Sequence, residues 1–439
     1  MNKLAAWIGH DLIGHLAFDI SSGLFAFDYT TEWKTHPKSY AISPHLQFER
    51  TDEIAVHSRS VRCFFENLLP EGNALDAAAS ANGLAKSNMF GLIRVLGREN
   101  AGAIALLPEG ERPDSTQVQL REITPDELSQ RIRDRDHLPF NVWDGKVRLS
   151  IAGVQDKIAV YMQGEHMYLT EGGNSASTHI LKPNPLRKGL ETLVANEYFC
   201  MKLAAAINLN AAEVEIRRMP EPVLLIKRFD RQAGAANVLR KHIIDACQAL
   251  DLPPAYKYER NFGNGKDVRH IRDGASFSKL FSLSTLSIQP AVFKMQILRW
   301  SLFQYLIGNS DAHGKNISFH VSHEGIHPAP AYDLVSVIAY NEFENEMAMG
   351  ISDAFNFPDA MAFQWADFAQ QCGLNKTLLA REMRRLATVT AKALEMPVPT
   401  LFTDNEKTII AQLKKYIRTQ CDNLIKIAAE VPKVTDSSL

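Results

Sequence analysis

The sequence has little of what marks nucleic-acid-binding, disulfide-stabilised or membrane-spanning proteins. Its formal net charge is −2 at pH 7, so no strongly basic footprint predicts a dedicated DNA- or RNA-binding protein. Its 5 cysteines are scattered and form no C-x-x-C pair, which excludes the common zinc and redox motifs. No low-complexity tract or fixed-period repeat stands out. The most apolar stretch, 288–307, carries Lys294 and Arg299 and therefore predicts a buried helix, not a membrane span.

The first residues make a poor signal peptide. His10 and Asp11 interrupt the apolar residues of "MNKLAAWIGHDLIGHLAF", whereas a secretory signal has a continuous apolar region. The scattered cysteines are most simply reduced packing residues, as in cytosolic proteins. We therefore expect a soluble, cytoplasmic protein without a membrane partner.

Length and pattern predict several structural parts. A chain of 439 residues is long enough for two or three domains. Residues 1–110 alternate short apolar runs and turns with a helical segment, which predicts a β-rich and helical N-terminal module. Residues 111–140 are polar and contain several prolines, which predicts a linker with one exposed helix. Strand patterns with one inserted helix follow at 141–245 and mainly helical patterns at 246–439, so we expect an α+β protein with two lobes after the module.

A polar loop interrupts the apolar run "FQYLIGNSDAHGKNISFHV" (303–321). Asp311 and Asn316 form a D-x-x-x-x-N pair, and Asp333 follows seventeen residues later. In protein kinases an Asp at this place accepts the proton of the substrate hydroxyl, and an Asn and a later Asp bind magnesium through oxygen atoms. The alternative is that Asp311 and Asn316 only turn the chain, as in many loops. A metallohydrolase would need clustered histidines, and this segment offers only His313 close by.

A nucleotide also needs a phosphate cradle and a cation on the strand-rich side. The chain has neither a G-x-G-x-x-G nor a Walker A motif. Instead, "RLSIAGVQDKIAV" places small residues between two strands, where backbone N–H groups can approach phosphate oxygens. Lys182 ends the strand "THILK", and "VLLIKRFDR" fits a strand beside an adenine slot. Taken singly, these segments also fit a hairpin, a solvated lysine and a core strand that ends at the surface.

Taken together, the motifs resemble the HipA family of bacterial toxin kinases, over nearly the whole chain. The segments that carry the resemblance are "FFENLLPEG" (64–72), "GRENAGAIALLP" (97–108), "SIAGVQDK" (150–157), "STHILKP" (177–183), "NEYFC" (196–200), "KRFDR" (227–231), "DACQ" (245–248), "KYE" (257–259), "GNSDAHGKN" (308–316) and "AYDL" (331–334). Their order along the chain is that of the family.

The resemblance implies a bilobal protein-kinase-like fold: a β-rich N-terminal lobe with the extra module, and a mainly helical C-terminal lobe. It implies a serine/threonine protein kinase that uses ATP and Mg²⁺ and is the toxin of a toxin–antitoxin pair. The targets of such kinases lie in translation, notably an aminoacyl-tRNA synthetase. The implied partner is a small, HipB-like DNA-binding antitoxin that represses the operon, and the toxin joins this complex on operator DNA.

The resemblance also implies roles for individual residues. Asp311 would be the catalytic base, Asn316 and Asp333 the magnesium ligands, and Ser150 the autophosphorylated serine. Lys182 would contact a phosphate, and 151–155 would be the phosphate loop. The positions that match nucleotide contacts are Ile151, Ala152, Gly153, Val154, Gln155, Lys182, Lys227, Phe229, Asp230, Gln248, His313 and Tyr332.

Two segments depart from the family pattern. Lys227 stands where the family's "ERFDR" has glutamate, so its backbone is the expected contact to adenine. The catalytic loop reads "SDAHGKN" where "DGHAKN" is commoner, and this exchange of small residues should preserve the chemistry.

Two other functions share part of the pattern. Small-molecule phosphotransferases of related fold have the Asp, the Asn and the later Asp, although Ser150 in the phosphate loop and the N-terminal module favour a protein kinase. A nucleotide-binding scaffold that acts without catalysis would have no need of a proton acceptor such as Asp311.

Overall fold

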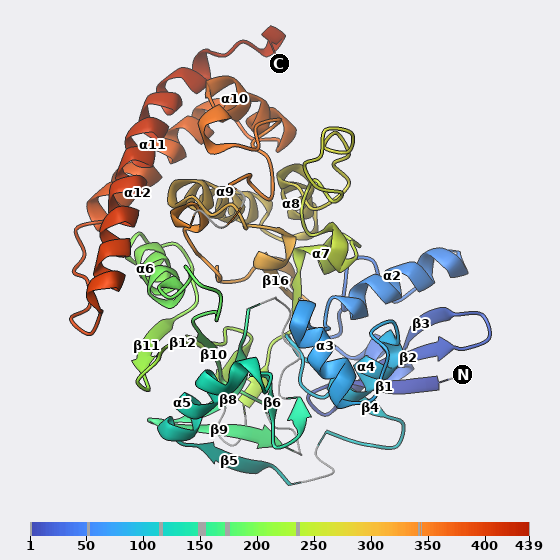
Figure 1. Cartoon of the computed structure of the whole chain (residues 1–439). Helices are drawn as coiled ribbons and strands as arrows, with labels where there is room; N and C mark the ends of the chain where they lie inside the picture. Colours follow the sequence, from blue (N-terminus) through green and yellow to red (C-terminus); the bar gives the residue numbers. More distant parts are fainter. Residues whose placement is uncertain are drawn as a thin grey trace. The chain divides into compact units, whose positions relative to one another are not determined.

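The computed structural model describes residues 2–50, 53–113, 117–147, 155–171, 176–233, 238–340, 343 and 345–438 (Figure 1). The chain folds into two compact units. Unit 1 comprises residues 1–185, 215–254 and 318–327, and unit 2 comprises residues 186–214, 255–317 and 328–439. Strands dominate unit 1 and helices dominate unit 2, which confirms the predicted α+β class.

Unit 1 begins with an antiparallel sheet of four strands in the order β3-β2-β1-β4. Its strands are β1 (Asn2–Ile8), β2 (Asp11–Asp19), β3 (Leu24–Tyr29) and β4 (Ile104–Pro108). β1 lies in the middle, because Ala6 pairs with Gly14 on one side and Leu106 on the other. Between β3 and β4 the chain forms α1 (Thr31–Thr35), α2 (Ile54–Glu66), α3 (Gly72–Ala81) and α4 (Met89–Leu96).

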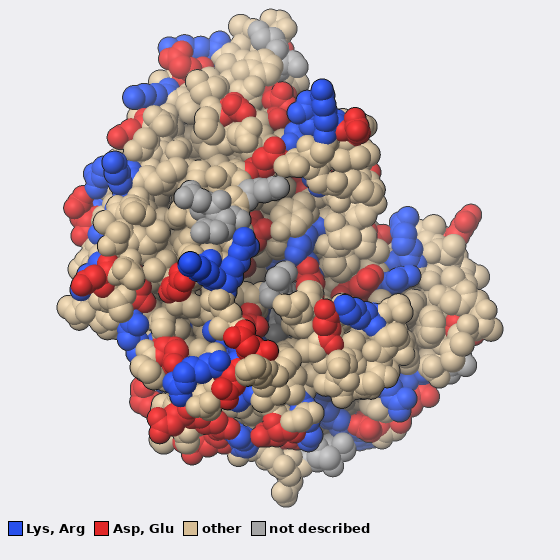
Figure 2. All heavy atoms as spheres, viewed as in Figure 1, with Lys and Arg blue, Asp and Glu red and all other residues tan. Residues whose placement is uncertain are grey.

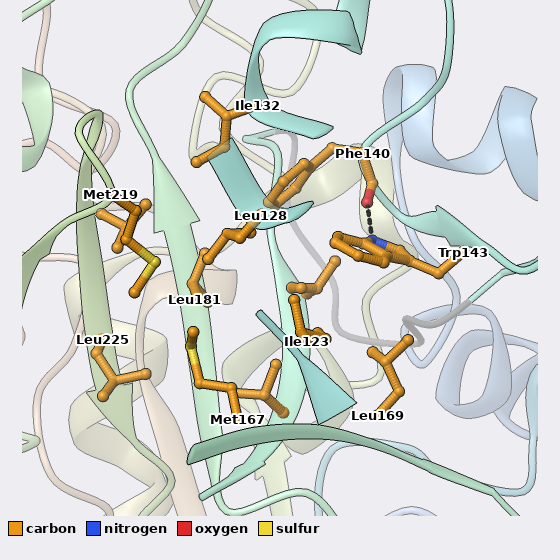
Figure 3. Close-up of a cluster of buried hydrophobic side chains, with 13 residues drawn as sticks. Ile123, Leu128, Ile132, Phe140, Trp143, Met167, Leu169, Leu181, Met219 and Leu225 are labelled. Atoms are coloured by element: carbon orange, nitrogen blue, oxygen red, sulfur yellow. Dashed lines mark hydrogen bonds between the residues drawn. The ribbon is translucent and has the colours of Figure 1, made fainter. Parts of the chain in front are cut away.

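A second sheet of unit 1 has six strands in the order β11-β12-β10-β8-β9-β5. They are β5 (Gln119–Ile123), β8 (Ile158–Gln163), β9 (His166–Glu171), β10 (His179–Pro183), β11 (Val214–Arg218) and β12 (Pro222–Lys227). β10 is central, since Leu181 pairs with Ile158 of β8 and Leu225 of β12. Apolar side chains of this sheet form one buried cluster with Leu128, Ile132, Phe140 and Trp143 (Figure 3).

The structure corrects the prediction of a linker with an exposed helix at 111–140. This segment supplies the edge strand β5 and helix α5 (Pro125–Arg133) to the six-stranded sheet. Leu128 and Ile132 lie four residues apart on one face of α5, and both are buried in the core. The helix is polar overall, and even Ser129 and Arg131 are buried beside the apolar pair, so composition concealed the buried stripe.

Unit 1 also has a small sheet of three strands, β15 (Ile243–Asp245), β16 (Ser318–Ser322) and β17 (Gly325–Pro328). Helix α7 (Ala246–Ala249) directly follows β15 and packs against β15 and β16. Because β15, α7 and β16 pack together, residues 246–254 and 318–327 belong to unit 1, beyond the predicted boundary at 245. The N-terminal module is bonded to this region: Asn67 Nδ2 donates to the Leu252 carbonyl at 2.9 Å. Two-stranded ribbons are β6 (Val142–Trp143) with β7 (Lys146–Val147), and β13 (Arg231–Ala233) with β14 (Val238–Arg240).

Unit 2 is a helical body. Its longer helices are α6 (Leu193–Ala206), α8 (Phe277–Ser282), α9 (Pro290–Ile307), α10 (Ala362–Gln371), α11 (Lys376–Ala393) and α12 (Asp404–Glu430). The helix predicted at 288–307 is confirmed as α9, and so is the mainly helical pattern predicted for the C-terminal part of the chain. α11 and α12 run side by side along one flank of the unit (Figure 1), and α9 packs against both.

No helix in the described part of the chain is both long and apolar enough to cross a membrane. On the face shown in Figure 2, the described acidic and basic side chains are interspersed, in keeping with the net charge of −2. All 5 cysteines are buried and without disulfides, as predicted for packing residues.

Candidate active site

The predicted catalytic loop starts where α9 stops. Gly308 ends the helix in the left-handed region, with φ of +67°, a conformation that glycine adopts without a steric penalty. A Cβ atom at this position would lie 2.6 Å from Ile338 Cγ2. Both facts require glycine here, so the end of α9 and the entry of the loop are fixed.

Side-chain amides hold the loop in shape. Asn309 Oδ1 accepts a hydrogen bond from the Asp311 backbone N–H at 3.1 Å, and Asn309 Nδ2 donates to Gln304 Oε1 at 2.8 Å. Asn316 Nδ2 donates to the Asp311 carbonyl at 2.8 Å. This bond directs the nitrogen of Asn316 into the loop and assigns its oxygen the opposite direction. Asp311 is exposed, whereas Asn316 is buried.

His313 is held neutral between these residues. Its Nδ1 accepts from the Lys315 backbone N–H at 3.2 Å, which places the ring proton on Nε2. Burial lowers the pKa of His313 to about 3, and Lys257 and Lys315 act in the same direction while Asp333 opposes them. A ring with this pKa stays uncharged near neutral pH and can donate through Nε2, but it does not serve as a cation.

The later aspartate is tied to the same loop. Asp333 has φ of +55°, a left-handed conformation that is rare for residues other than glycine and is often found at functional sites. Its carbonyl accepts from Asn309 Nδ2 at 3.4 Å, and Tyr332 Oη donates to the Lys315 carbonyl at 2.7 Å. The structure therefore brings the predicted Asp311, His313, Asn316, Tyr332 and Asp333 together in unit 2.

The residue types suit magnesium. Asn316 offers an amide oxygen and Asp333 a carboxylate, and Mg²⁺ in phosphoryl-transfer sites is typically held by one or two such ligands plus phosphate oxygens. In the described part of the chain, no three His, Cys, Asp or Glu side chains cluster as a metal site would need.

The predicted phosphate contacts lie in unit 1. Lys182 sits in the central strand β10, pairs with Leu224 of β12 and is 4% exposed. Gln155 Nε2 donates to the carbonyl of Pro183, the next residue after Lys182, at 3.3 Å. The rest of the predicted phosphate loop and the predicted phosphorylation site fall outside the described residues: Ser150, Ile151, Ala152, Gly153 and Val154.

The residues at the end of the predicted adenine strand differ in how far their side chains are exposed to solvent. Lys227, the last residue of β12, is exposed and pairs with His179. The Phe229 ring is partly buried and meets the His320 ring edge-on, with centroids 6.1 Å apart. Asp230 is buried, and its carboxylate accepts hydrogen bonds from Arg228 and from Gly102 N–H.

Gln248 is likewise engaged within the protein. Its backbone N–H donates to Asp245 Oδ1, its side-chain oxygen accepts from Asp245 N–H, and its Nε2 donates to the Phe64 carbonyl at 3.0 Å. Asp230 and Gln248 thus make internal contacts, and their predicted contacts to a nucleotide remain predictions.

Sequence reasoning assigned no role to several residues that shape the site. Tyr258 Oη donates to Asp311 Oδ1 at 2.7 Å, although its motif "KYE" had only marked the family resemblance. Asn309, which orients the loop, stood unremarked inside "GNSDAHGKN". Glu99 accepts from Ser177 N–H at 2.7 Å in a network with Arg228, and only the family-like segment 97–108 pointed to it.

Comparison with known proteins places the chain in a family. The family model for the HipA-like C-terminal domain matches residues 149–394, and the model for the HipA N-terminal domain matches residues 4–107. The chain is 39% identical to the serine/threonine-protein kinase toxin HipA of Shewanella oneidensis, over 97% of each sequence. It is 33% identical to a putative kinase, Y4mE, of Sinorhizobium fredii, over 89% of this chain and 90% of that protein.

The structure agrees with the sequence comparisons. A chain in the solved complex of Shewanella oneidensis HipA, HipB and operator DNA superposes with a TM-score of 0.88 and 38% identity, covering 98% of this chain and 100% of that chain. The fold, the loop geometry and both family models therefore agree: the chain belongs to the HipA family of serine/threonine-protein kinases.

Proposed function

We propose that this kinase is the toxin of a toxin–antitoxin pair that phosphorylates a protein of the translation machinery, an aminoacyl-tRNA synthetase. Two findings support the toxin role: the similar Shewanella protein is named a kinase toxin, and the solved relative is a complex of HipA with HipB and operator DNA. The proposed partner is accordingly a small DNA-binding antitoxin, with operator DNA bound through that complex. Such a partner and such a target place the chain in the cytoplasm.

One observation carries the catalytic proposal. Asn316 Nδ2 donates to the Asp311 carbonyl, and Asp333 is joined to the same loop through Asn309. These bonds join the Asn316 side chain and the backbones of Asp311 and Asp333, the three residues proposed as proton acceptor and magnesium ligands, in one hydrogen-bonded unit. Phosphoryl transfer needs mainly such positioning and charge compensation, because little covalent chemistry falls to the protein. Asp311 accepts the substrate hydroxyl proton in this proposal, and its exposure leaves it accessible to a protein substrate.

The nucleotide roles divide between the units, as in a bilobal kinase-like fold. Unit 1 supplies the phosphate loop 151–155, Lys182 as the phosphate contact, and the end of β12 as the adenine contact. Unit 2 supplies His313 and Tyr332, and Asn316 and Asp333 would hold Mg²⁺, which compensates phosphate charge when bound. Lys182 lies buried in the central strand β10, and its role as the phosphate contact is proposed from the family resemblance.

The proposal includes self-inactivation at Ser150. A phosphoserine adds about −1.5 to −2 charges at neutral pH. Next to the proposed phosphate loop, this charge competes with the nucleotide's own phosphates. Phosphorylation would therefore weaken ATP binding and turn the kinase off.

A labelling experiment tests the proposed substrate class. The purified chain is incubated with γ-labelled ATP, magnesium and whole-cell extract, and an Asp311→Asn variant serves as the control. We expect a single labelled protein besides the kinase itself, absent with Asp311→Asn. A labelled metabolite would show that the chain is a small-molecule phosphotransferase instead. If nothing is labelled, the chain is a nucleotide-binding scaffold without catalytic activity.

A further inference from the structure

Tyr258 makes a direct contact with the proposed proton acceptor. Its Oη donates to Asp311 Oδ1 at 2.7 Å, a normal length for a hydrogen bond between a hydroxyl and a carboxylate. Its ring meets the buried His313 ring edge-on, with centroids 5.0 Å apart. Tyr258 itself is 37% exposed. The Tyr258 ring thus contacts His313, while its hydroxyl is bonded to the Asp311 carboxylate.

The backbone on both sides of Tyr258 is anchored. The Lys257 carbonyl accepts from the Gly314 N–H of the catalytic loop at 2.9 Å. On the other side, Glu259 is 3% exposed, and its Oε2 accepts from the Gly350 N–H at 2.7 Å. Arg272 Nε donates to Glu259 Oε1 at 2.7 Å. These bonds fix the position from which the Tyr258 side chain extends.

The segment around Tyr258 is also hydrogen-bonded to residues 274 and 275. Gly274 N–H donates to the Glu259 carbonyl at 3.2 Å, and Ala275 N–H donates to the Tyr256 carbonyl at 2.9 Å. A Cβ atom on Gly274 would lie 1.8 Å from the Tyr258 carbonyl oxygen, a distance that no side chain tolerates. Glycine at 274 therefore permits the close approach that holds Tyr258 in register with the loop.

We propose that Tyr258 is a positioning residue for phosphoryl transfer: its hydroxyl holds the Asp311 carboxylate in the orientation that receives the substrate hydroxyl. The proposal rests on the assignment of Asp311 as the proton acceptor. Phosphoryl transfer depends more on the alignment of the attacking oxygen than on the strength of the base. The hydrogen bond from Tyr258 Oη to Oδ1 fixes the plane of the Asp311 carboxylate. It thereby sets the direction of the other oxygen, Oδ2.

Two other roles are less consistent with these contacts. A tyrosine that blocks the site until substrate arrives would need a segment free to withdraw, but the backbone at 257 and 259 is bonded to the loop and to Gly350. A purely structural tyrosine would bury its hydroxyl or bond it to the backbone, whereas Tyr258 Oη donates to the proposed catalytic carboxylate.

Tyr258→Phe tests the proposal, because it removes the hydroxyl and keeps the ring against His313. The readouts are the initial rate of phosphate transfer from labelled ATP to protein, divided by the number of ATP-binding sites, and the ATP concentration at half-maximal rate. We expect the maximal rate per site to fall about 10-fold, the loss typical of one charge-assisted hydrogen bond, with the half-maximal ATP concentration unchanged. Dividing by ATP sites removes the effect of any unfolded fraction.

The matched control is Tyr256→Phe, two residues earlier, whose ring packs near Phe262 with centroids 6.3 Å apart. It should leave the rate unchanged. An unchanged rate per site in Tyr258→Phe overturns the positioning role, a raised rate identifies Tyr258 as a block, and a change confined to the half-maximal ATP concentration assigns it to nucleotide binding. Activity retained in Asp311→Asn would instead overturn the proposed function on which this inference rests.

Discussion

Arg228 and Asp230 form a two-point ion pair just after β12: Arg228 Nε donates to Oδ1 at 2.9 Å, and its Nη2 donates to Oδ2 at 2.7 Å. Arg231 Nη1 donates to the same Oδ2 at 2.7 Å, and Gly102 N–H does so at 2.8 Å. All three charged side chains are buried. The pair thus bonds the N-terminal module, through Asn100 and Gly102, to the segment that leaves the proposed adenine strand.

Asp230→Asn should destabilise unit 1. Burial alone would raise the pKa of Asp230, but Arg228 and Arg231 outweigh it and hold the pKa below its ordinary value. Removing the carboxylate charge takes away the anion bonded to both buried guanidinium groups and leaves them only the more distant Glu99 carboxylate, and breaking such a buried pair costs about 3–5 kcal/mol. Urea unfolding measures the loss. The control is Asp28→Asn, whose exposed pair with Arg50 should cost less than about 1 kcal/mol; equal losses in the two variants would contradict the structural role of Asp230.

The buried His242 should make stability depend on pH. Burial lowers its pKa to about 4, although the Ile42 carbonyl, 2.9 Å from Nε2, partly opposes this. Below about pH 6.5 the unfolded chain binds a proton at this residue and the folded chain does not. Stability is therefore fully present above about pH 6.5 and falls by up to about 1.4 kcal/mol per pH unit down to about pH 4.

His242→Gln should remove this contribution, so the difference in unfolding free energy between wild type and variant should shrink as the pH falls from 6.5 to 4. The exposed His270, changed to Gln, is the control and should leave the pH dependence as in the wild type. A wild-type pH dependence in His242→Gln would show that the pKa of His242 is not lowered in the folded protein.

Asp333→Ala should weaken the binding of ATP in the presence of magnesium. The proposed magnesium site would lose its carboxylate ligand, and the phosphates of the nucleotide would lose charge compensation. Calorimetric titration of ATP with and without magnesium measures the effect, and the exposed Asp353→Ala is the control. If magnesium strengthens ATP binding equally in Asp333→Ala and wild type, Asp333 is not a ligand.

Ser150 should become phosphorylated when the kinase is incubated with ATP and magnesium. The transfer should pass between molecules, because a serine beside the proposed phosphate loop could not easily reach the terminal phosphate of its own nucleotide in line with Asp311. Mass spectrometry of a mixture of wild type with a size-tagged Asp311→Asn variant tests this: phosphate on Ser150 of the inactive variant shows transfer in trans. An ATP affinity unchanged by complete Ser150 phosphorylation would contradict the proposed switch.

The sequence predicted those helices and strands that show a periodic pattern within a short stretch of residues. Period-2 alternation predicted the strands seen as β8, β9 and β10, and a long apolar run predicted the helix seen as α9. The acid, amide and later acid were also recognisable, because their spacing is characteristic of kinases. The structure adds the hydrogen bond from Asn316 to Asp311, which makes these residues one unit.

Contacts between residues far apart in the sequence were not predictable in this way. Glu99 and Arg228 are 129 positions apart, and Tyr258 and Asp311 are 53 apart, so no local periodicity links them. Polar composition also misled the reading of α5, where a short apolar stripe of Leu128 and Ile132 decides its burial. Composition averages over both faces of a helix, whereas packing depends on one face.

The most direct test of the account is the Asp311→Asn variant of the purified kinase. Asn keeps the size and the backbone bond from Asn316 but cannot accept the hydroxyl proton as a carboxylate does, so the transition state loses stabilisation while the contacts to ATP remain. The account predicts that phosphate transfer from labelled ATP to protein is abolished and that the dissociation constant for ATP and magnesium stays near the wild-type value. Transfer at a near-wild-type rate would contradict the assignment of Asp311 as the proton acceptor.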